Sequence, residues 1–94
     1  MPTVEFWGYS PEKQYRLMDV LSGLFGELDF HDDIVFVVDE RAATKVLSTT
    51  GEQRPFMRLH SRSAERLRIM RDLCLPHSDV ETVVIGFDER TDRR

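Results

Sequence analysis

The chain has 94 residues, of which 40% are hydrophobic and 32% are charged, and its formal net charge is −4. This composition excludes a disordered chain, and no apolar run approaches the roughly 20 residues that a bilayer-spanning helix needs. We therefore expect one soluble, folded domain over residues 1–94 that does not contact membranes. Nucleic acid is not an expected partner, because the net charge is negative.

The first predicted element is a β-strand close to the N-terminus. Val4 and Phe6 alternate with Thr3, Glu5 and Trp7. This period of two is typical of a strand that buries one face and leaves the other open. The open face is rich in aromatic side chains in both halves of the chain, so we expect it to be covered by another subunit.

A helix is predicted to follow this strand. Ser10 can cap its N-terminus, and Pro11 suits its first turn. An apolar stripe at 3.6-residue spacing consists of Leu17, Leu21, Leu24 and Leu28, flanked by Met18 and Phe25. We expect the helix to end between Leu24 and Leu28, because glycines at 23 and 26 weaken its last turns.

The next predicted element is a second strand at Ile34 to Val38. This run of β-branched and aromatic residues is unbroken, which is typical of a strand covered on both faces. We therefore expect it to be central in its sheet. Asp39 to Gln53 then forms a connection, in which Ala42 to Leu47 can make about a turn and a half of helix.

A second strand, helix and strand follow the same plan. Met57 and Leu59 alternate with Phe56, Arg58 and His60, as expected for a strand with one buried face. Ser63 can cap a helix that runs to about Leu75, with an apolar stripe made of Leu67, Met70 and Cys74. Pro76 ends this helix, and the last predicted strand runs from Glu81 to Phe87.

The two halves of the chain form an internal repeat. At an offset of 53 residues, the matching pairs are Pro2 with Pro55, Val4 with Met57, Phe6 with Leu59, Ser10 with Ser63, Glu12 with Glu65, Leu17 with Met70 and Val20 with Leu73. The repeated units are residues 2–39 and 54–87, and a polar tail follows at 88–94. A βαβ unit normally has parallel strands and a right-handed crossover. We therefore predict an α+β fold, a two-layer sandwich with both helices on one face of a four-stranded mixed sheet.

The charge is distributed unevenly between the halves. Residues 1–40 hold two basic and nine acidic side chains, whereas residues 41–94 hold eleven basic and eight acidic ones. The densest positive stretch is 54–71, which has six arginines against Glu65 alone. This stretch predicts either an anion site or a surface that meets the acidic half.

The sequence also indicates the cellular compartment. The single cysteine, Cys74, excludes an internal disulfide, and the N-terminus lacks a basic segment followed by an apolar one. Both features favour the cytoplasm. A chain this short buries a modest fraction of its surface when alone, so a homo-oligomer is expected.

The repeated plan resembles that of the tautomerase superfamily, whose members include macrophage-migration-inhibitory-factor-like and 4-oxalocrotonate-tautomerase-like proteins. Both units open on a proline, at Pro2 and Pro55, and about fifteen residues rather than a tight hairpin separate them. The resemblance implies a trimer whose sheets surround a central axis. The ferredoxin-like fold, which also contains two βαβ units, is the alternative architecture.

The resemblance implies a role for Pro2 as general acid or base in an isomerase that interconverts keto and enol forms. Tautomerases use an N-terminal proline, exposed after the initiator Met is removed, to move a proton between enol oxygen and carbon. A prolyl nitrogen at a chain terminus is a secondary amine, whereas that of an internal proline accepts no proton. Burial in an apolar pocket would favour the unprotonated amine. The other interpretation of Pro2 is an ordinary residue at the start of a strand.

The family also holds a substrate carboxylate with an arginine just before the helix-capping serine. Arg62 matches that arrangement before Ser63. Tyr9 stands at the equivalent place in the first unit and is a further candidate substrate-binding residue. A guanidinium beside a helix N-terminus suits a carboxylate, since both donate N–H groups to an anion. His60 is a candidate polar partner of Pro2, or else a residue of a subunit interface. The expected substrate is thus a small carbonyl acid.

One departure from the family matters for the substrate. The arginine that the family carries early in the second strand falls here at about Val35 or Phe36, and neither side chain binds an anion. This places the usual diacid substrate in doubt.

The alternative function is a non-catalytic oligomeric binding or assembly module with the same or a ferredoxin-like fold. No cofactor is predicted, because Gly-rich phosphate loops and dinucleotide motifs are missing from the sequence. No metal site is predicted either. Cys74 and His77 are three residues apart, but no second pair of ligands completes a site.

Overall fold

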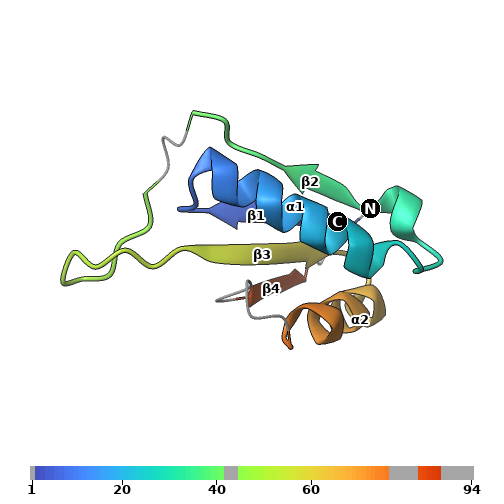
Figure 1. The fold of residues 1–94 in the computed structure, drawn as a ribbon. Coiled ribbons are helices and arrows are strands. Elements are labelled where there is room, and N and C mark those ends of the chain that lie inside the picture. Colours follow the sequence, from blue (N-terminus) through green and yellow to red (C-terminus); the bar gives the residue numbers. More distant parts are fainter. Residues whose placement is uncertain (1, 42–44, 77–82, 88–94) are drawn as a thin grey trace, which may run out of the picture.

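The computed structural model describes residues 2–41, 45–76 and 83–87, the last range by its backbone alone. The elements in chain order are β1 (Thr3–Trp7), α1 (Pro11–Phe25), a 3-10 turn η1 (His31–Asp33), β2 (Val35–Val37), β3 (Phe56–Ser61), α2 (Ala64–Cys74) and β4 (Val83–Phe87) (Figure 1). Each half is therefore a strand, a helix and a strand. This arrangement confirms the predicted α+β class.

The strands lie side by side in the order β2-β1-β3-β4. Within each unit the two strands are neighbours and run parallel, β1 with β2 and β3 with β4. The units join through the antiparallel pair β1 and β3, with Val4 opposite Leu59. In a ferredoxin-like fold each βαβ unit is split by a strand of the other unit. The observed order therefore differs from that alternative.

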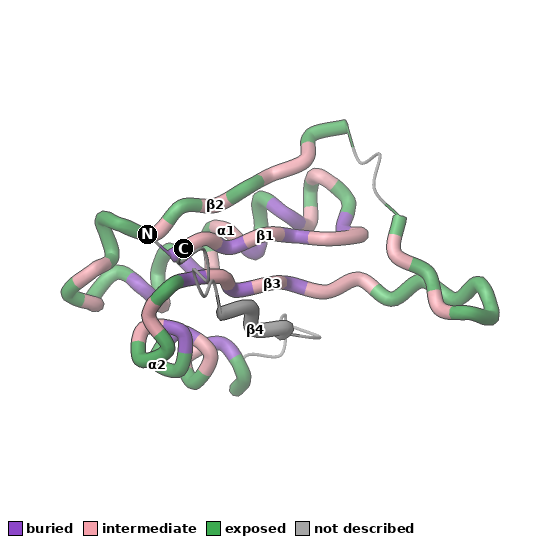
Figure 2. Tube along the Cα trace, turned by 180° about the vertical axis from the view of Figure 1, so that it is seen from behind, coloured by how far each residue is buried: buried purple, intermediate pink, exposed green. Residues whose placement is uncertain are grey.

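The core fills the space between one face of the sheet and the two helices. Val4 and Phe6 of β1 and Met57 and Leu59 of β3 are buried, as the alternation predicts. They form one hydrophobic cluster with buried side chains of both helices, namely Leu17, Leu21, Phe25, Leu67, Met70 and Cys74. Both helices thus cover the same face, and Figure 2 shows the buried segments gathered on β1, β3 and the inner sides of α1 and α2.

The helix ends follow their capping residues. The hydroxyl of Ser10 accepts a hydrogen bond from the backbone N–H of Lys13, and Ser63 does the same for Arg66. Both caps were predicted from the sequence, and Pro11 is the first residue of α1 as expected. The repeat therefore extends to matched capping and to matched burial of Leu17 and Met70, which are both fully buried.

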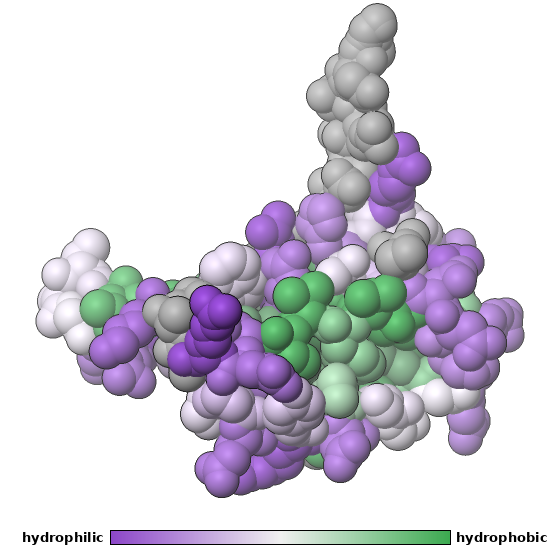
Figure 3. Space-filling view, turned by 90° about the horizontal axis from the view of Figure 1, so that it is seen from above, coloured by the Kyte–Doolittle hydropathy of each residue, from purple (hydrophilic) through white to green (hydrophobic). Residues whose placement is uncertain are grey.

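The prediction of a central, doubly covered second strand is wrong. β2 has three residues and lies at the edge of the sheet, with Val35 39% exposed and Val37 49% exposed. Within the run Ile34 to Val38, the alternate residues Ile34, Phe36 and Val38 are partly buried against the core. Figure 3, which views the molecule from the β2 side, shows hydrophobic side chains gathered in the middle of that side. The apolar run is unbroken because β2 has two apolar faces. One face packs toward the helices, and the other, with Val35 and Val37, is exposed in the single chain.

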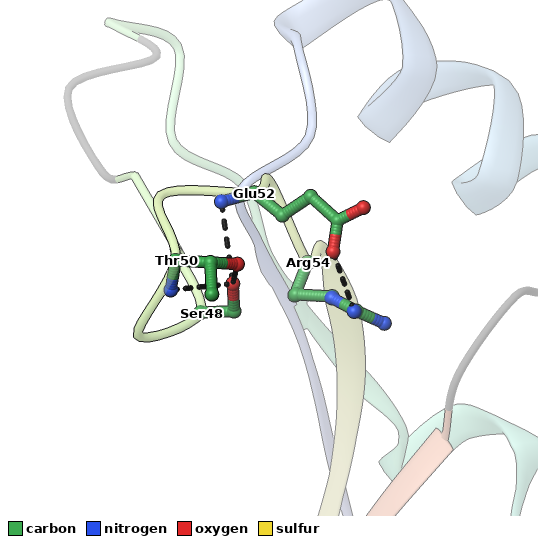
Figure 4. A network of polar contacts seen from close by, with 4 residues as sticks. All are labelled: Ser48, Thr50, Glu52 and Arg54. Carbon is green, nitrogen blue, oxygen red and sulfur yellow. Dashed lines mark hydrogen bonds and ion pairs between the residues drawn. The ribbon is translucent and has the colours of Figure 1, made fainter.

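The connection between the units is a projecting hairpin (Figures 1 and 2). Leu47 forms an isolated antiparallel bridge with Gln53, and no helix is present at 45–47, while 42–44 lie outside the described residues. The Ser48 hydroxyl accepts hydrogen bonds from the backbone N–H groups of Thr50 and Glu52 (Figure 4). These local bonds stabilise a turn of hairpin type after Leu47.

A buried glutamine ties α1 to the end of β2. The Gln14 side chain is 1% exposed, and its Nε2 donates to the carbonyl oxygens of Tyr9 at 2.9 Å and Asp39 at 3.0 Å. Its Oε1 accepts from the backbone N–H of Asp39 at 2.7 Å. The amide thus pairs with both backbone groups of Asp39, as a neighbouring strand would. One residue further on, the Tyr15 hydroxyl donates to the Glu40 carboxylate, and this bond is the main reason that the pKa of Tyr15 is raised.

Replacement of Gln14 by Leu keeps the side-chain volume but removes its three hydrogen bonds to the backbone of Tyr9 and Asp39. We expect the free energy of unfolding to fall by about 2 to 4 kcal/mol. Urea unfolding followed by the fluorescence of Trp7, the only tryptophan, measures the change. Gln53→Leu is the matched control at an exposed position. An equal loss of stability in the two variants would contradict this role of Gln14.

Candidate functional site

The antiparallel register of β1 and β3 gathers three of the predicted site residues at one end of the sheet. Thr3 lies opposite His60, so Pro2 just before β1 and Arg62 just after β3 belong to the same end. The N-terminus of α2 also starts there, at the Ser63 cap. We call this region the Pro2 end.

Pro2 is fully buried, and its ring is among the core side chains with less than 2% exposure. Its carbonyl oxygen accepts a hydrogen bond of 2.9 Å from the backbone N–H of Val35, which fixes the start of β1 beside the start of β2. Because Val4 and Phe6 face the helices, Pro2 two residues earlier belongs to the same face. The residue is thus held rigidly at the edge of the apolar core.

Arg62 and His60 take different positions around this end. Arg62 is exposed in the turn between β3 and α2. His60 is partly buried and lies on the open face of the sheet, since it alternates with the buried Leu59 and Ser61. The Ser61 hydroxyl accepts a hydrogen bond of 3.0 Å from the backbone N–H of Ser63, which shapes the turn that carries Arg62.

Tyr9 lies at the other end of β1. The whole of β1, about 16 Å of extended chain, and Gly8 separate it from Pro2. Its ring is buried and packs edge-on against Phe6, with ring centroids 6.3 Å apart. The structure therefore does not bring Tyr9 together with Pro2, Arg62 and His60.

The two halves also meet through charged side chains at the Pro2 end. The Arg66 guanidinium lies 3.5 Å from the Asp33 carboxylate and 4.6 Å from the centre of the Phe30 ring. Both charged partners are partly exposed, so the pair contributes little to stability by itself. The pair does place a cation of the basic stretch 54–71 against the acidic first half of the chain. Contact with the acidic half is one of the two roles predicted for that stretch.

The open face of the sheet carries polar and aromatic side chains, as predicted. Glu5 and Arg58 are direct cross-strand partners, and Arg58 Nη1 lies 3.9 Å from Glu5 Oε1. The rings of Trp7 and Phe56 stack beside them with centroids 6.1 Å apart and planes 8° apart. We call the exposed side of β2, β1 and β3 the open face.

Two cavities lie away from the predicted site residues. One of about 300 Å³ is lined by Glu5, Phe6, Trp7, Val37 and Asp39, where β2 ends beside β1. Another of about 250 Å³ lies between the end of α1 and β2 and is lined by Ser22, Phe25, Gly26, His31, Ile34 and Phe36. None of Pro2, Arg62, His60 and Tyr9 lines either cavity.

Gln14, which positions Asp39 at the first of these cavities, is not among the residues predicted from the sequence. The sequence does contain a signal for the buried position of Gln14. Gln14 lies three residues before Leu17 and therefore on the apolar stripe of α1, where a polar side chain needs buried partners. The stripe itself is shifted from the predicted one, because Leu24 is only partly buried while Phe25 is fully within the core.

The described residues contain no group of three or more His, Cys, Asp or Glu side chains able to hold a metal ion. Cys74 is a fully buried core residue, and burial raises the pKa of its thiol to about 12. His77, its nearest candidate co-ligand, lies outside the described residues. Among the described helices, none combines the length and the apolar character that crossing a membrane requires.

Comparisons with protein-family models, with curated proteins and with solved structures found no match.

The raised pKa of Cys74 predicts an unreactive thiol. Because the folded state holds the thiol proton up to a pH of about 12, the nucleophilic thiolate is scarce at mildly alkaline pH. We expect a disulfide reagent such as Ellman's reagent to label the protein only after unfolding, in step with urea-induced loss of structure. Rapid labelling of the folded protein would contradict the buried position.

The raised pKa of Cys74 also determines how the stability of the folded protein changes with pH. A thiol whose pKa is raised by folding stabilises the folded state below its unfolded value of about 8.5, and this contribution is lost as the pH rises toward 12. Cys74→Ser removes the titrating group and should therefore flatten this alkaline loss of stability.

Proposed function

We propose that this chain is a tautomerase-like protein that interconverts keto and enol forms of a small carbonyl acid, with Pro2 as the general acid and base. The observation that carries the proposal is the shared position of Pro2 and Arg62 at one end of the sheet. Adjacent parallel strands within each unit, joined by an antiparallel central pair, also support a tautomerase-like rather than a ferredoxin-like strand plan. In this proposal the protein acts in the cytoplasm, where its lone cysteine stays reduced.

The chemistry needs a free prolyl nitrogen. Once Met1 is removed, the Pro2 nitrogen accepts the proton of the enol hydroxyl and delivers a proton to the carbon of the enol double bond, which yields the keto form. The proline ends the cycle as it began, and no cofactor is required. The apolar surroundings of Pro2 favour the uncharged amine that starts this cycle.

Arg62 gives the substrate its orientation. Its exposed guanidinium, next to the backbone N–H groups at the start of α2, can bind one carboxylate through two hydrogen bonds. The family's second arginine is replaced here at Val35 or Phe36, and β2 holds these residues as apolar neighbours of Thr3 and Val4. We therefore propose a monoacid as the preferred substrate rather than a diacid.

The proposal predicts ketonisation of phenylenolpyruvate by untagged protein, with mass spectrometry confirming that Met1 is absent. Pro2→Ala should lower kcat by about a hundredfold or more, because it removes the secondary amine. Pro55→Ala changes the equivalent proline of the second unit and serves as the control. Equal rates for Pro2→Ala and the unmodified protein would contradict a catalytic role.

Arg62 is tested through substrate binding. Arg62→Ala should raise KM by about tenfold, since a charge-assisted hydrogen bond contributes 1.5 to 3 kcal/mol. Arg68→Ala, at an exposed position of α2, is the matched control. The diacid 2-hydroxymuconate should be a poorer substrate than phenylenolpyruvate, and the reverse order would contradict a single-arginine site.

A second candidate function, a non-catalytic assembly module, is favoured by the apolar part of the open face. Val35 and Val37 are exposed on the same face of the sheet as the stacked rings of Trp7 and Phe56, and the outer edge of β2 has no strand neighbour in the described sheet. Burial against further copies of the chain would cover this surface. A homo-oligomer, with three subunits as the resemblance implies, belongs to both candidate functions.

Self-association is tested by sedimentation. Val35→Glu should shift the oligomer to a monomer, because it places a charge in the proposed interface. Ile69 lies on α2 and is 37% exposed, close to the 39% of Val35. Ile69→Glu is therefore the control and should leave the oligomer intact. A monomeric unmodified protein at all concentrations would contradict this part of the proposal.

A further inference from the structure

We propose that the groove between the ends of β1 and β2 binds a guanidinium group. The groove is the cavity of about 300 Å³ lined by Glu5, Phe6, Trp7, Val37 and Asp39. It lies at the opposite end of β1 from Pro2 and shares none of the residues of the proposed tautomerase site. The inference is therefore independent of the proposed function.

The groove exists because β2 leaves β1 early. The parallel register ends at Glu5 opposite Val37, whereas β1 continues to Trp7. Beyond Val37, the backbone N–H and C=O of Asp39 turn to the Gln14 amide at 2.7 and 3.0 Å. The end of β1 is thus left beside an opening instead of a strand. Since Gln14 is buried and fully bonded, this opening is preformed.

The lining combines the groups that recognise a flat cation. Trp7 supplies an aromatic surface, and its other side is backed by the stacked ring of Phe56. The indole Nε1 donates to Glu5 Oε1 at 3.0 Å, which fixes the carboxylate beside the ring. A carboxylate adjacent to an aromatic face binds a guanidinium well, because the planar cation both stacks and donates paired hydrogen bonds.

The charge of the groove also favours a cationic ligand. Both titratable side chains that line it, Glu5 and Asp39, are acidic, and neither a lysine nor an arginine lines it. The Arg58 guanidinium lies 3.9 Å from Glu5 Oε1, beyond hydrogen-bonding distance, and so neutralises that carboxylate only in part. The exposed Val37 side chain supplies an apolar wall that suits the alkyl chain that carries a guanidinium. A volume of 300 Å³ is at the lower end of the range for small-ligand sites.

The chemistry admits two sources, a free alkylguanidine or an arginine side chain of a peptide. Agmatine represents the first, and N-acetyl-arginine methylamide represents the second. Trp7 is the only tryptophan, so its fluorescence reports binding in the groove directly. We expect saturable quenching of Trp7 by at least one of the two probes. N-butylurea, which is neutral and of similar shape, should give no saturable change.

Two variants locate the site. Glu5→Gln should weaken probe binding by about tenfold, as expected for loss of one charge-assisted hydrogen bond. Asp39→Asn should also weaken it, and it leaves the backbone contacts with Gln14 in place. Asp19→Asn, an exposed position on α1, is the control for a general change of charge. Circular dichroism checks that each variant is folded.

Each outcome bears on the proposal. Quenching by agmatine alone assigns the groove to a free alkylguanidine, quenching by the blocked arginine alone assigns it to a peptide, and both results support guanidinium recognition. No saturable quenching by either probe would overturn the proposal. Equal binding by N-butylurea, or equal affinity in the folded Glu5→Gln and Asp19→Asn variants, would overturn it as well.

Discussion

The antiparallel pairing of β1 with β3 is the constraint on which the rest of the structure depends. It is the only described strand pairing that joins the two repeated units, and it sets which residues of one unit meet those of the other. With Val4 opposite Leu59, the buried side chains of both strands point to the helices together, and Glu5 faces Arg58 on the open side. A slip of one residue would turn every side chain of one strand to the wrong face. The same register gathers Pro2 and Arg62 at one end.

Much of this arrangement is local enough to predict from the sequence. Alternation at Val4 and Phe6 gives the buried face of β1, and the serines at 10 and 63 give the helix starts, because a cap depends on a few neighbouring residues. The edge position of β2 could not be predicted in this way. An unbroken apolar run is the pattern of a strand between two layers, yet Val35 and Val37 are exposed in the single chain. Their apolar character is explained if a further subunit supplies the second layer.

The site was predictable only in part, for a similar reason. Pro2 and Arg62 are brought together by a register that connects residues about sixty positions apart, whereas Tyr9 was chosen by its place in the repeat and lies at the far end of the strand. For Gln14, the residue itself can be found in the sequence but its partners cannot. Its place on the α1 stripe is visible in the sequence, but its partners at Tyr9 and Asp39 are backbone groups that no residue pattern identifies. The groove that follows from this contact is likewise a tertiary feature.

The most direct measurement of the central pairing is a set of cross-strand nuclear Overhauser effects in isotope-labelled protein. The observed register requires backbone contacts between Thr3 and His60 and between Glu5 and Arg58, with contacts from β1 to β2 on the other side of β1. Contacts that place a strand of the second unit between β1 and β2, as in a split βαβ arrangement, would contradict it. So would a shifted register, because Pro2 and Arg62 would then no longer share one end of the sheet.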